Sequence, residues 1–321
     1  MSSLQSTPIS ALAEELVQNI TNNGVNKNNI PSGFQFLDEE FGGLTLGDLV
    51  VIGGRPAMGK TLFAVNLIAT LSKTIPVLYF SFDITPATLA ARIISFKTKI
   101  PVDKILSNQL IKADQELIRE ESKKLGNNKL HVSEIGLGNI DKIIAQINEH
   151  VNEQQTKVVV IDYLQLIGEG KYSSGREAEI GHICRTLKRC AKELNICIVL
   201  LSHLSRAVET RSYSKKPQLS DLRDSGTIEQ TADKVLLLYR PEYYLIEELD
   251  DDAGTPADSL LLVYVAKNKN GKMGVSYFKR NYQFTEFKSI RNPAEHFDFD
   301  EGRLHELNLP DRTENENEVP F

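Results

Sequence analysis

Two hydrophobic patterns alternate along the chain. Short runs of consecutive apolar residues are separated by segments in which apolar residues recur every three or four positions. The runs show no polar alternation, which is typical of parallel strands covered on both faces, and the spaced segments predict helices. The predicted strands are 49–52, 77–80, 158–161, 196–201, 234–239, 260–266 and 274–278, and the predicted helices are 60–71, 85–96, 140–150 and 177–194.

The order of these elements predicts an α/β fold. From Ile30 onward strands alternate with helices, as in right-handed crossover units that build a mostly parallel central sheet flanked by helices. The last two predicted strands are joined by a short turn, so we expect an antiparallel C-terminal extension of this sheet.

The two ends of the chain differ from its middle. Ile9, Leu12, Leu16 and Ile20 fall at helical spacing, and an asparagine-rich linker follows them. So short a helix is marginal alone and is expected to dock, either on another chain or back on its own core. From about Asn292 the sequence is acidic and poor in apolar residues, which predicts a flexible tail. The predicted units are a linker at 1–29, an α/β domain at 30–290 and a tail at 291–321.

Composition adds few constraints. Hydrophobic residues make up 41% of the chain and charged residues 25%, as in ordinary globular proteins. No apolar run approaches the ~20 residues that cross a bilayer, and the first residues lack the pattern of a secretion signal. We therefore expect a cytoplasmic protein with no membrane association. The net charge of −6 argues against nonspecific coating of nucleic acid, so any DNA contact must come from local positive groups.

The three cysteines predict neither disulfides nor a metal site. Cys184, Cys190 and Cys197 form no CxxC pair, and His182 with Cys184 is too small a ligand set for zinc. We expect buried thiols in a helix and the strand that follows it.

A phosphate-binding motif gives the sharpest chemical signal. Residues 54–61 match GxxxxGK[ST] between a predicted strand and a predicted helix, the context of a P-loop rather than of a chance glycine-rich turn. The loop backbone and the helix N-terminus favour phosphate. Lys60 is expected to reach the terminal phosphates of ATP, and Thr61 to bind Mg²⁺. The predicted nucleotide-binding residues of the loop are Gly54, Arg55, Ala57, Met58, Gly59, Lys60 and Thr61.

Two aspartates are predicted to lie at the same edge of the sheet. Asp162 ends a buried strand, where ligands bind in open α/β sheets, so it is a second candidate ligand for Mg²⁺. Asp83 follows the strand at 77–80, where it serves either as the general base of hydrolysis or as the cap of the next helix.

An ordered series of short motifs resembles the C-terminal motor domain of the bacterial DnaB-type replicative helicases. The resemblance covers 11–287, and its Asp221–Asp233 block is far more specific than the P-loop. Its motifs are Ile-Pro-Ser-Gly at 30–33, the P-loop, Ser-Phe-Asp-Ile at 81–84, Ile-Asp-Tyr-Leu-Gln at 161–165, DLRDSGTIEQTAD at 221–233, Tyr-Arg-Pro-Glu-Tyr-Tyr at 239–244 and Lys-Asn-Lys-Asn-Gly at 267–271.

The resemblance implies a RecA-like fold, a hexameric ring with ATP sites between subunits, and a helicase that moves on single-stranded DNA during replication. It also implies that the N-terminal helix packs on a neighbouring subunit. By the same resemblance, Asp83 takes the place of the catalytic glutamate, Arg92 lies near the nucleotide, and His203 replaces a glutamine that senses the γ-phosphate. The resemblance also implies that Lys267 and Lys269 reach into the next subunit's site. The loop that binds the DNA backbone would contain Arg223, Asp224 and Gly226.

Three of these positions depart from the family pattern. Aspartate at 83 shortens the reach of the carboxylate, histidine at 203 can still donate to phosphate, and Lys269 keeps the charge of an arginine without its bidentate fork. With Lys60, Thr61 and Asp162 intact, these changes predict a working but slower ATPase.

Features outside the domain leave alternatives open. Only about thirty residues precede the domain, so we do not expect the family's usual N-terminal route to primase. The acidic end at 314–321 finishes with Pro-Phe and resembles the docking peptide of single-stranded-DNA-binding proteins, which predicts recruitment of replication proteins. A solvated end is the alternative.

Two other functions also fit a P-loop: a RecA-like regulatory or recombination ATPase, and a noncatalytic scaffold that joins helicase rings.

Overall fold

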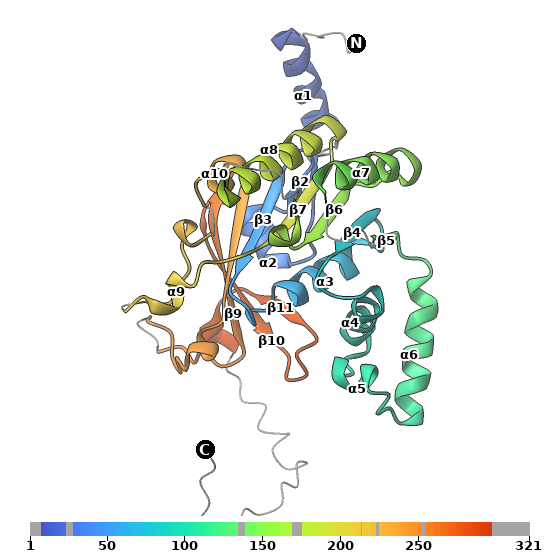
Figure 1. Ribbon diagram of the computed structural model, residues 1–321, viewed down its shortest axis with the longest axis vertical. Coiled ribbons are helices and arrows are strands. Elements are labelled where there is room, and N and C mark those ends of the chain that lie inside the picture. The colour runs from blue at the N-terminus through green and yellow to red at the C-terminus, as the bar shows by residue number, and fades with distance from the viewer. Residues whose placement is uncertain are drawn as a thin grey trace, which may run out of the picture.

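A computed structural model describes residues 8–23, 28–133, 139–168, 175–212, 214–222, 225–251 and 254–296. Within them a nine-stranded sheet has the order β11-β10-β9-β8-β3-β7-β6-β4-β5, and helices cover both of its faces (Figure 1). Its strands are β3 (Leu49–Gly54), β4 (Val77–Ser81), β5 (Leu130–Ser133), β6 (Val158–Asp162), β7 (Cys197–His203), β8 (Lys234–Tyr239), β9 (Leu260–Asn268), β10 (Gly274–Arg280) and β11 (Phe287–Ile290).

The helices and a small second sheet complete the chain. Strands β1 (Asn29–Ile30) and β2 (Leu44–Thr45) pair with each other. The helices are α1 (Ile9–Asn23), α2 (Gln35–Phe41), α3 (Lys60–Leu71), α4 (Pro86–Thr98), α5 (Val102–Leu106), α6 (Lys112–Leu125), α7 (Ile140–Gln154), α8 (Arg176–Leu194), α9 (Ala207–Thr210) and α10 (Ser225–Thr231).

The large sheet is parallel from β8 to β5 and antiparallel from β8 to β11, as the sequence predicts. Strand β3 lies between β7 and β8, with Gly54 opposite His203 at one end. The same register places Ser81 opposite Asp162. The carboxyl ends of four strands, β3, β4, β6 and β7, therefore meet at one edge.

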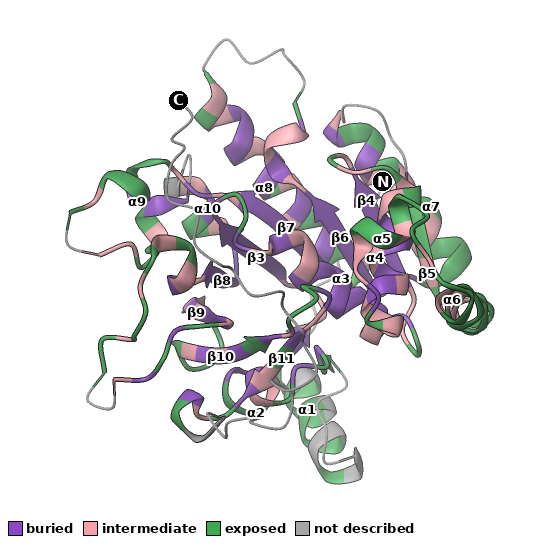
Figure 2. Cartoon of the chain, turned by 90° about the horizontal axis from the view of Figure 1, so that it is seen from below, coloured by how far each residue is buried: buried purple, intermediate pink, exposed green. Residues whose placement is uncertain are grey.

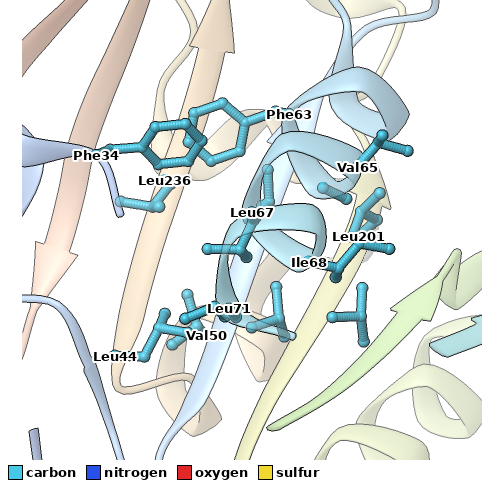
Figure 3. Packing of buried hydrophobic residues seen from close by; sticks show 14 of the residues in the cluster. Phe34, Leu44, Val50, Phe63, Val65, Leu67, Ile68, Leu71, Leu201 and Leu236 are labelled. Atoms are coloured by element: carbon cyan, nitrogen blue, oxygen red, sulfur yellow. The ribbon is translucent and has the colours of Figure 1, made fainter. Parts of the chain in front are cut away.

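Alternate residues of the central strands enter two separate cores. On one face Val50 and Ile52 pack with α3, whose Phe63 and Leu67 lie against Leu236 of β8 (Figure 3). On the other face the intervening residues, such as Val51, pack with α7 and α8. Both faces of β3 are buried, and the strands at the centre of Figure 2 are purple throughout. The absence of polar alternation in the sequence thus has a structural cause.

The elements predicted from the sequence are present. The helix 60–71 and the strand 234–239 have the predicted ends, and the others differ by a few residues; β7, for example, begins at Cys197 rather than at residue 196 and continues to His203. The sequence reasoning missed α2, α5, α6, α9, α10, β1, β2, β5 and β11. The three predicted domain units stay a prediction, and the tail beyond residue 296 lies outside the described residues.

Helix α1 does not fold back onto the core of its own chain. It projects from the body in Figure 1, and the side chains of Ile9, Leu16 and Val17 are 81%, 59% and 60% exposed. Of the two docking alternatives, the exposed apolar side chains favour contact with another chain.

The cysteines are buried thiols, as predicted. Cys184 and Cys190 lie in α8 and Cys197 in β7, all three unpaired. Burial raises the pKa of the Cys184 thiol to about 12 and that of Cys190 to about 11. Over the described ranges, no helix is both long enough and apolar enough to cross a membrane.

Candidate active site

The P-loop runs from the end of β3 to the start of α3. Gly59 precedes α3 with φ +88°, and Ala57 also has a positive φ of 64°. A Cβ atom on Gly59 would lie 2.8 Å from the Phe287 ring, so only glycine fits there. The loop is therefore a backbone cradle at a helix N-terminus, which suits phosphate.

Lys60 lies inside this cradle with its ammonium on the loop's own carbonyls. Its Nζ donates to the carbonyl oxygens of Gly54 (2.8 Å) and Arg55 (3.0 Å). Burial lowers the pKa of Lys60 to about 8, and the nearby Asp162 carboxylate opposes that shift. The buried cation is thus held within reach of any anion that enters the loop.

Asp162 receives two hydrogen bonds at the same oxygen. Thr61 Oγ1 donates to Asp162 Oδ2 over 3.0 Å, and the hydroxyl of Tyr79 donates to it over 2.7 Å. Burial raises the pKa of Asp162, and the two hydrogen bonds oppose that rise. Thr61 and Asp162 together are hard oxygen donors, which fit Mg²⁺ bound jointly with phosphates. In the part of the chain that is described, no group of three or more His, Cys, Asp or Glu side chains could hold a metal by itself.

A cavity of about 390 Å³ opens over the loop. Asp83 and Arg92 line it together with Lys60, Thr61 and Asp162. The Nε atom of Arg92 is buried and has no hydrogen-bond partner among the described residues. An orphaned guanidinium donor beside a glycine cradle fits a polyphosphate.

Asp83 is exposed to this cavity and is not a helix cap. Helix α4 begins after Thr85, whose side chain accepts the hydrogen bond from the backbone N–H of Thr88. The capping alternative for Asp83 is therefore wrong, and its carboxylate stays directed to the site that it lines.

His203 ends β7 beside the same cavity. Its ring meets Tyr163 edge to face, with centroids 4.3 Å apart, and its backbone N–H donates to Gln165 Oε1. A second cavity of about 620 Å³, lined by Gln165, Arg206 and others, adjoins it and shares Tyr163 and His203. His203 therefore lies between the phosphate cavity and a neighbouring hollow.

Two predicted P-loop residues direct their side chains elsewhere. Arg55 donates to Glu209 Oε1 and to the carbonyl of Leu204, both at 2.9 Å. The side chain of Met58 is 1% exposed, and its sulfur accepts the backbone N–H of Arg240. Only the backbone of these two residues is available to a phosphate.

The sequence reasoning missed the outer wall of the cavity. Arg240 and Phe284 line it, and Arg240 Nη1 donates to the carbonyl of Ala57. The guanidinium of Arg280 lies 3.5 Å from the centroid of the Phe284 ring, and Glu242 pairs with both arginines. Arg240 belongs to a motif noted in the sequence, whereas Phe284 gave no signal.

The remaining predicted residues lie away from this cavity. Lys267 Nζ donates to the carbonyl of Glu229 (2.6 Å), and Lys269 Nζ lies 3.8 Å from Asp233 Oδ1. In the β8–β9 register, Lys267 pairs with Val235 near the start of β8, at the edge opposite the P-loop. Gly226 is exposed in the first turn of α10, and Arg223 and Asp224 lie outside the described residues.

These features define a P-loop nucleotide-binding domain with a parallel sheet and an antiparallel extension. The family model for the DnaB-like helicase C terminal domain matches residues 29–289. The chain belongs to this family, which confirms the resemblance seen in the sequence motifs.

Similar proteins agree with this assignment. A probable replicative DNA helicase of Trieres chinensis is 37% identical over 262 residues, which cover 80% of this chain and 56% of that protein. The replicative DNA helicase DnaB of Rickettsia conorii is 35% identical over 283 residues, covering 81% and 57%. The chain thus spans little more than half the length of these relatives.

Solved structures confirm the predicted RecA-like fold. An ATPase domain of known structure superposes with a TM-score of 0.80 at 27% identity, covering 89% of this chain and all of that one. A DnaB-like replicative helicase, described with its interactions with primase, gives 0.77 at 28% identity over 89% of this chain and 68% of its own.

Proposed function

We propose that this chain is the ATP-driven motor of a replicative DNA helicase, which moves as a ring on single-stranded DNA and unwinds the duplex. One observation carries the proposal: Lys60, Thr61, Asp162 and Asp83 converge on one cavity in a chain of the DnaB-like family.

In this proposal the P-loop residues bind and orient ATP. Lys60 exchanges its two carbonyl contacts for the terminal phosphates, and Arg92 donates its unpaired Nε–H to a phosphate oxygen. Thr61 and Asp162 hold Mg²⁺, which neutralises charge that develops on the phosphates. The nucleobase lies against the outer wall formed by Arg240 and Phe284.

Asp83 is the proposed general base. Its exposed carboxylate lines the cavity beside Lys60 and Asp162, where it can orient a water and accept its proton. His203 is placed to donate to the terminal phosphate from the end of β7. Asp83 is one methylene shorter than a glutamate, so we expect slow turnover.

Ring assembly is part of the proposal. Lys267 and Lys269 lie at the edge opposite the P-loop, so they can reach phosphate only in the site of a neighbouring copy. The exposed apolar side chains of α1 are available to such a neighbour. The loop that leads into α10, with Arg223, Asp224 and Gly226, is the proposed contact with the DNA backbone. Recruitment of replication proteins through 314–321 rests on the sequence alone.

The test is Mg-ATP hydrolysis with and without single-stranded oligo-dT, with Lys60→Ala as the blank. We expect activity well above the blank and a several-fold stimulation by DNA, because the channel loop and the ATP site are coupled in a translocating motor. Activity indifferent to DNA would favour the regulatory ATPase. No activity in a protein shown by mass to be a ring would favour the scaffold.

A further inference from the structure

A buried tyrosine contacts the carboxylate proposed to hold Mg²⁺. Tyr79 lies in β4 with no exposed surface, and its hydroxyl donates to Asp162 Oδ2 over 2.7 Å. The ring packs in the apolar core beneath the P-loop helix, among residues such as Val160 and Ile93. The Tyr79 ring therefore lies in the apolar core, and its hydroxyl reaches the Asp162 carboxylate.

The strand register explains how the hydroxyl arrives there. Tyr79 is paired with Val160, and two residues further on Ser81 is paired with Asp162. Two residues of a strand span about 6.6 Å, close to the reach of a tyrosine side chain that leans along its strand. A tyrosine at this register position thus meets the carboxylate across the β4–β6 pair, which a shorter side chain could not do.

The two hydroxyls that bind Asp162 differ in what else they contact. Both donate to Oδ2. Thr61 also lines the cavity, and in the proposed site its hydroxyl binds the metal. Tyr79 is fully enclosed by the core and is not among the residues that line the cavity. Tyr79 therefore makes its hydrogen bond without touching what occupies the cradle.

We propose that Tyr79 is a positioning residue of the ATP site, whose hydroxyl fixes the Asp162 carboxylate in the orientation that presents it to the metal. This inference rests on the proposed function, because it presupposes a Mg²⁺–nucleotide complex at Asp162. Tyr79 touches neither nucleotide nor metal and acts through Asp162 alone.

A purely structural hydroxyl is the competing explanation. A buried tyrosine needs a partner for its O–H, and Asp162 provides one. In that case removal of the hydroxyl would change thermal stability and leave metal binding unchanged. Tyr79→Phe separates the two explanations, because it keeps the packed ring and removes only the donor.

The experiment measures metal binding without turnover. Mn²⁺ is titrated into the protein with saturating non-hydrolysable ATP analogue, free Mn²⁺ is followed by its EPR signal, and the same titration of the analogue alone is subtracted. Loss of one hydrogen bond to a charged group should weaken Mn²⁺ binding by Tyr79→Phe on the order of tenfold. Binding of the analogue in excess EDTA should stay within about twofold, because the phosphate cradle is untouched.

A matched control removes a hydroxyl elsewhere. Tyr264→Phe alters a half-buried tyrosine of β9 that packs against Tyr239, away from the phosphate cavity. It should bind Mn²⁺ like the unchanged protein. In an Asp162→Asn background, Tyr79→Phe should have no further effect, since the residue acts only through that carboxylate.

Each outcome decides one point. Mn²⁺ affinity of Tyr79→Phe within about twofold of the unchanged protein, or tighter, rejects the role of Tyr79 and leaves the proposed function standing. An additional loss in the Asp162→Asn background also rejects it. Failure of the unchanged protein to bind Mn²⁺ with the analogue rejects the proposed function, and the role of Tyr79 with it.

Discussion

Two lysines at opposite edges of the parallel sheet are held in different ways. At the carboxyl edge, Lys60 is 8% exposed and lies in the P-loop cradle, close to Thr61 and Asp162. At the opposite edge, the Lys269 side chain is 66% exposed and lies 3.8 Å from Asp233. Lys60 is part of a binding site that opens on a cavity, whereas Lys269 presents its charge to solvent.

In the proposed function, one chain holds only part of a catalytic site. The carboxyl edge has a cradle, metal-type donors and a candidate base, yet the cations proposed to complete it lie across the sheet. In a head-to-tail ring each edge of one copy can face the other edge of the next. The comparison therefore predicts unequal effects for substitutions at the two edges.

The largest effect is expected for Asp83→Asn. Loss of a general base costs on the order of a hundred- to ten thousandfold in rate. Steady-state Mg-ATP hydrolysis should fall on that scale, while affinity for a fluorescent ATP analogue stays within a few-fold, because the cradle is unchanged.

Asp103→Asn is the matched control for that loss. Asp103 is exposed in α5 and does not line the cavity, so its variant should hydrolyse ATP at the original rate. Turnover of Asp83→Asn within about threefold of the original would remove Asp83 from the role of base.

A smaller effect is expected at the opposite edge. Lys269→Ala removes a charge that is proposed to act on the neighbour's phosphates, so turnover should fall on the order of ten- to a hundredfold. The exposed Lys272 belongs to the same turn, and Lys272→Ala should leave turnover unchanged. Nucleotide binding measured on dissociated chains should be equal in all three proteins.

Mixing the two defective variants tests directly whether the two edges act on one ATP site. In rings assembled from equal amounts of Asp83→Asn and Lys269→Ala, about a quarter of the interfaces combine an intact Asp83 with an intact Lys269. Such mixtures should regain turnover above either parent. Mixtures no more active than the parents would mean that the two edges do not share a site.

The smallest effect is expected from Glu242→Gln, beside the P-loop. Burial favours the neutral form of Glu242, but hydrogen bonds from Arg240, the Ser259 N–H and Arg280 outweigh it, so its pKa lies below the ordinary 4.5. Its contribution to stability is therefore full above pH 4.5 and is lost as the pH falls below that value.

The variant should consequently melt slightly below the original at about pH 6, and the gap should close as the pH falls below 4.5. Because Glu242 and its two arginine partners are largely buried, the difference should be on the order of 1 kcal/mol. Thermal unfolding followed by circular dichroism at several pH values checks this, and a gap that widens in acid would contradict it.

The sequence predicts the sheet better than its periphery, for a physical reason. Strands β3 and β6 are buried on both faces, so each appears in the sequence as a continuous apolar run. Helix α6 contains no fully buried residue and few apolar side chains among many charged ones, and it was missed. Strand β5 is an edge strand of four residues with two of them exposed, which gives too short a pattern.

Sequence reasoning likewise found some residues of the candidate site and missed others. Lys60 and Thr61 are neighbours in one motif, and Asp162 is marked by the strand that it ends, so sequence reasoning found all three. Tyr79 contacts Asp162 across 83 residues, and that contact depends on the register of two strands. No local pattern carries such information, because Tyr79 reads as one more apolar strand residue.

The contacts that hold β8 against the N-terminal segment have a consequence for synthesis of the chain. Lys234 Nζ donates to the carbonyls of Phe41, Gly42 and Gly43, the last of them 191 residues earlier. Asp233 accepts the backbone N–H of Leu49 at the start of β3. A ribosome must therefore translate about three quarters of the 321 residues before the strand that leads into the P-loop acquires these partners. Until then the apolar strand β3, which is buried on both faces in the folded domain, stays exposed in the nascent chain.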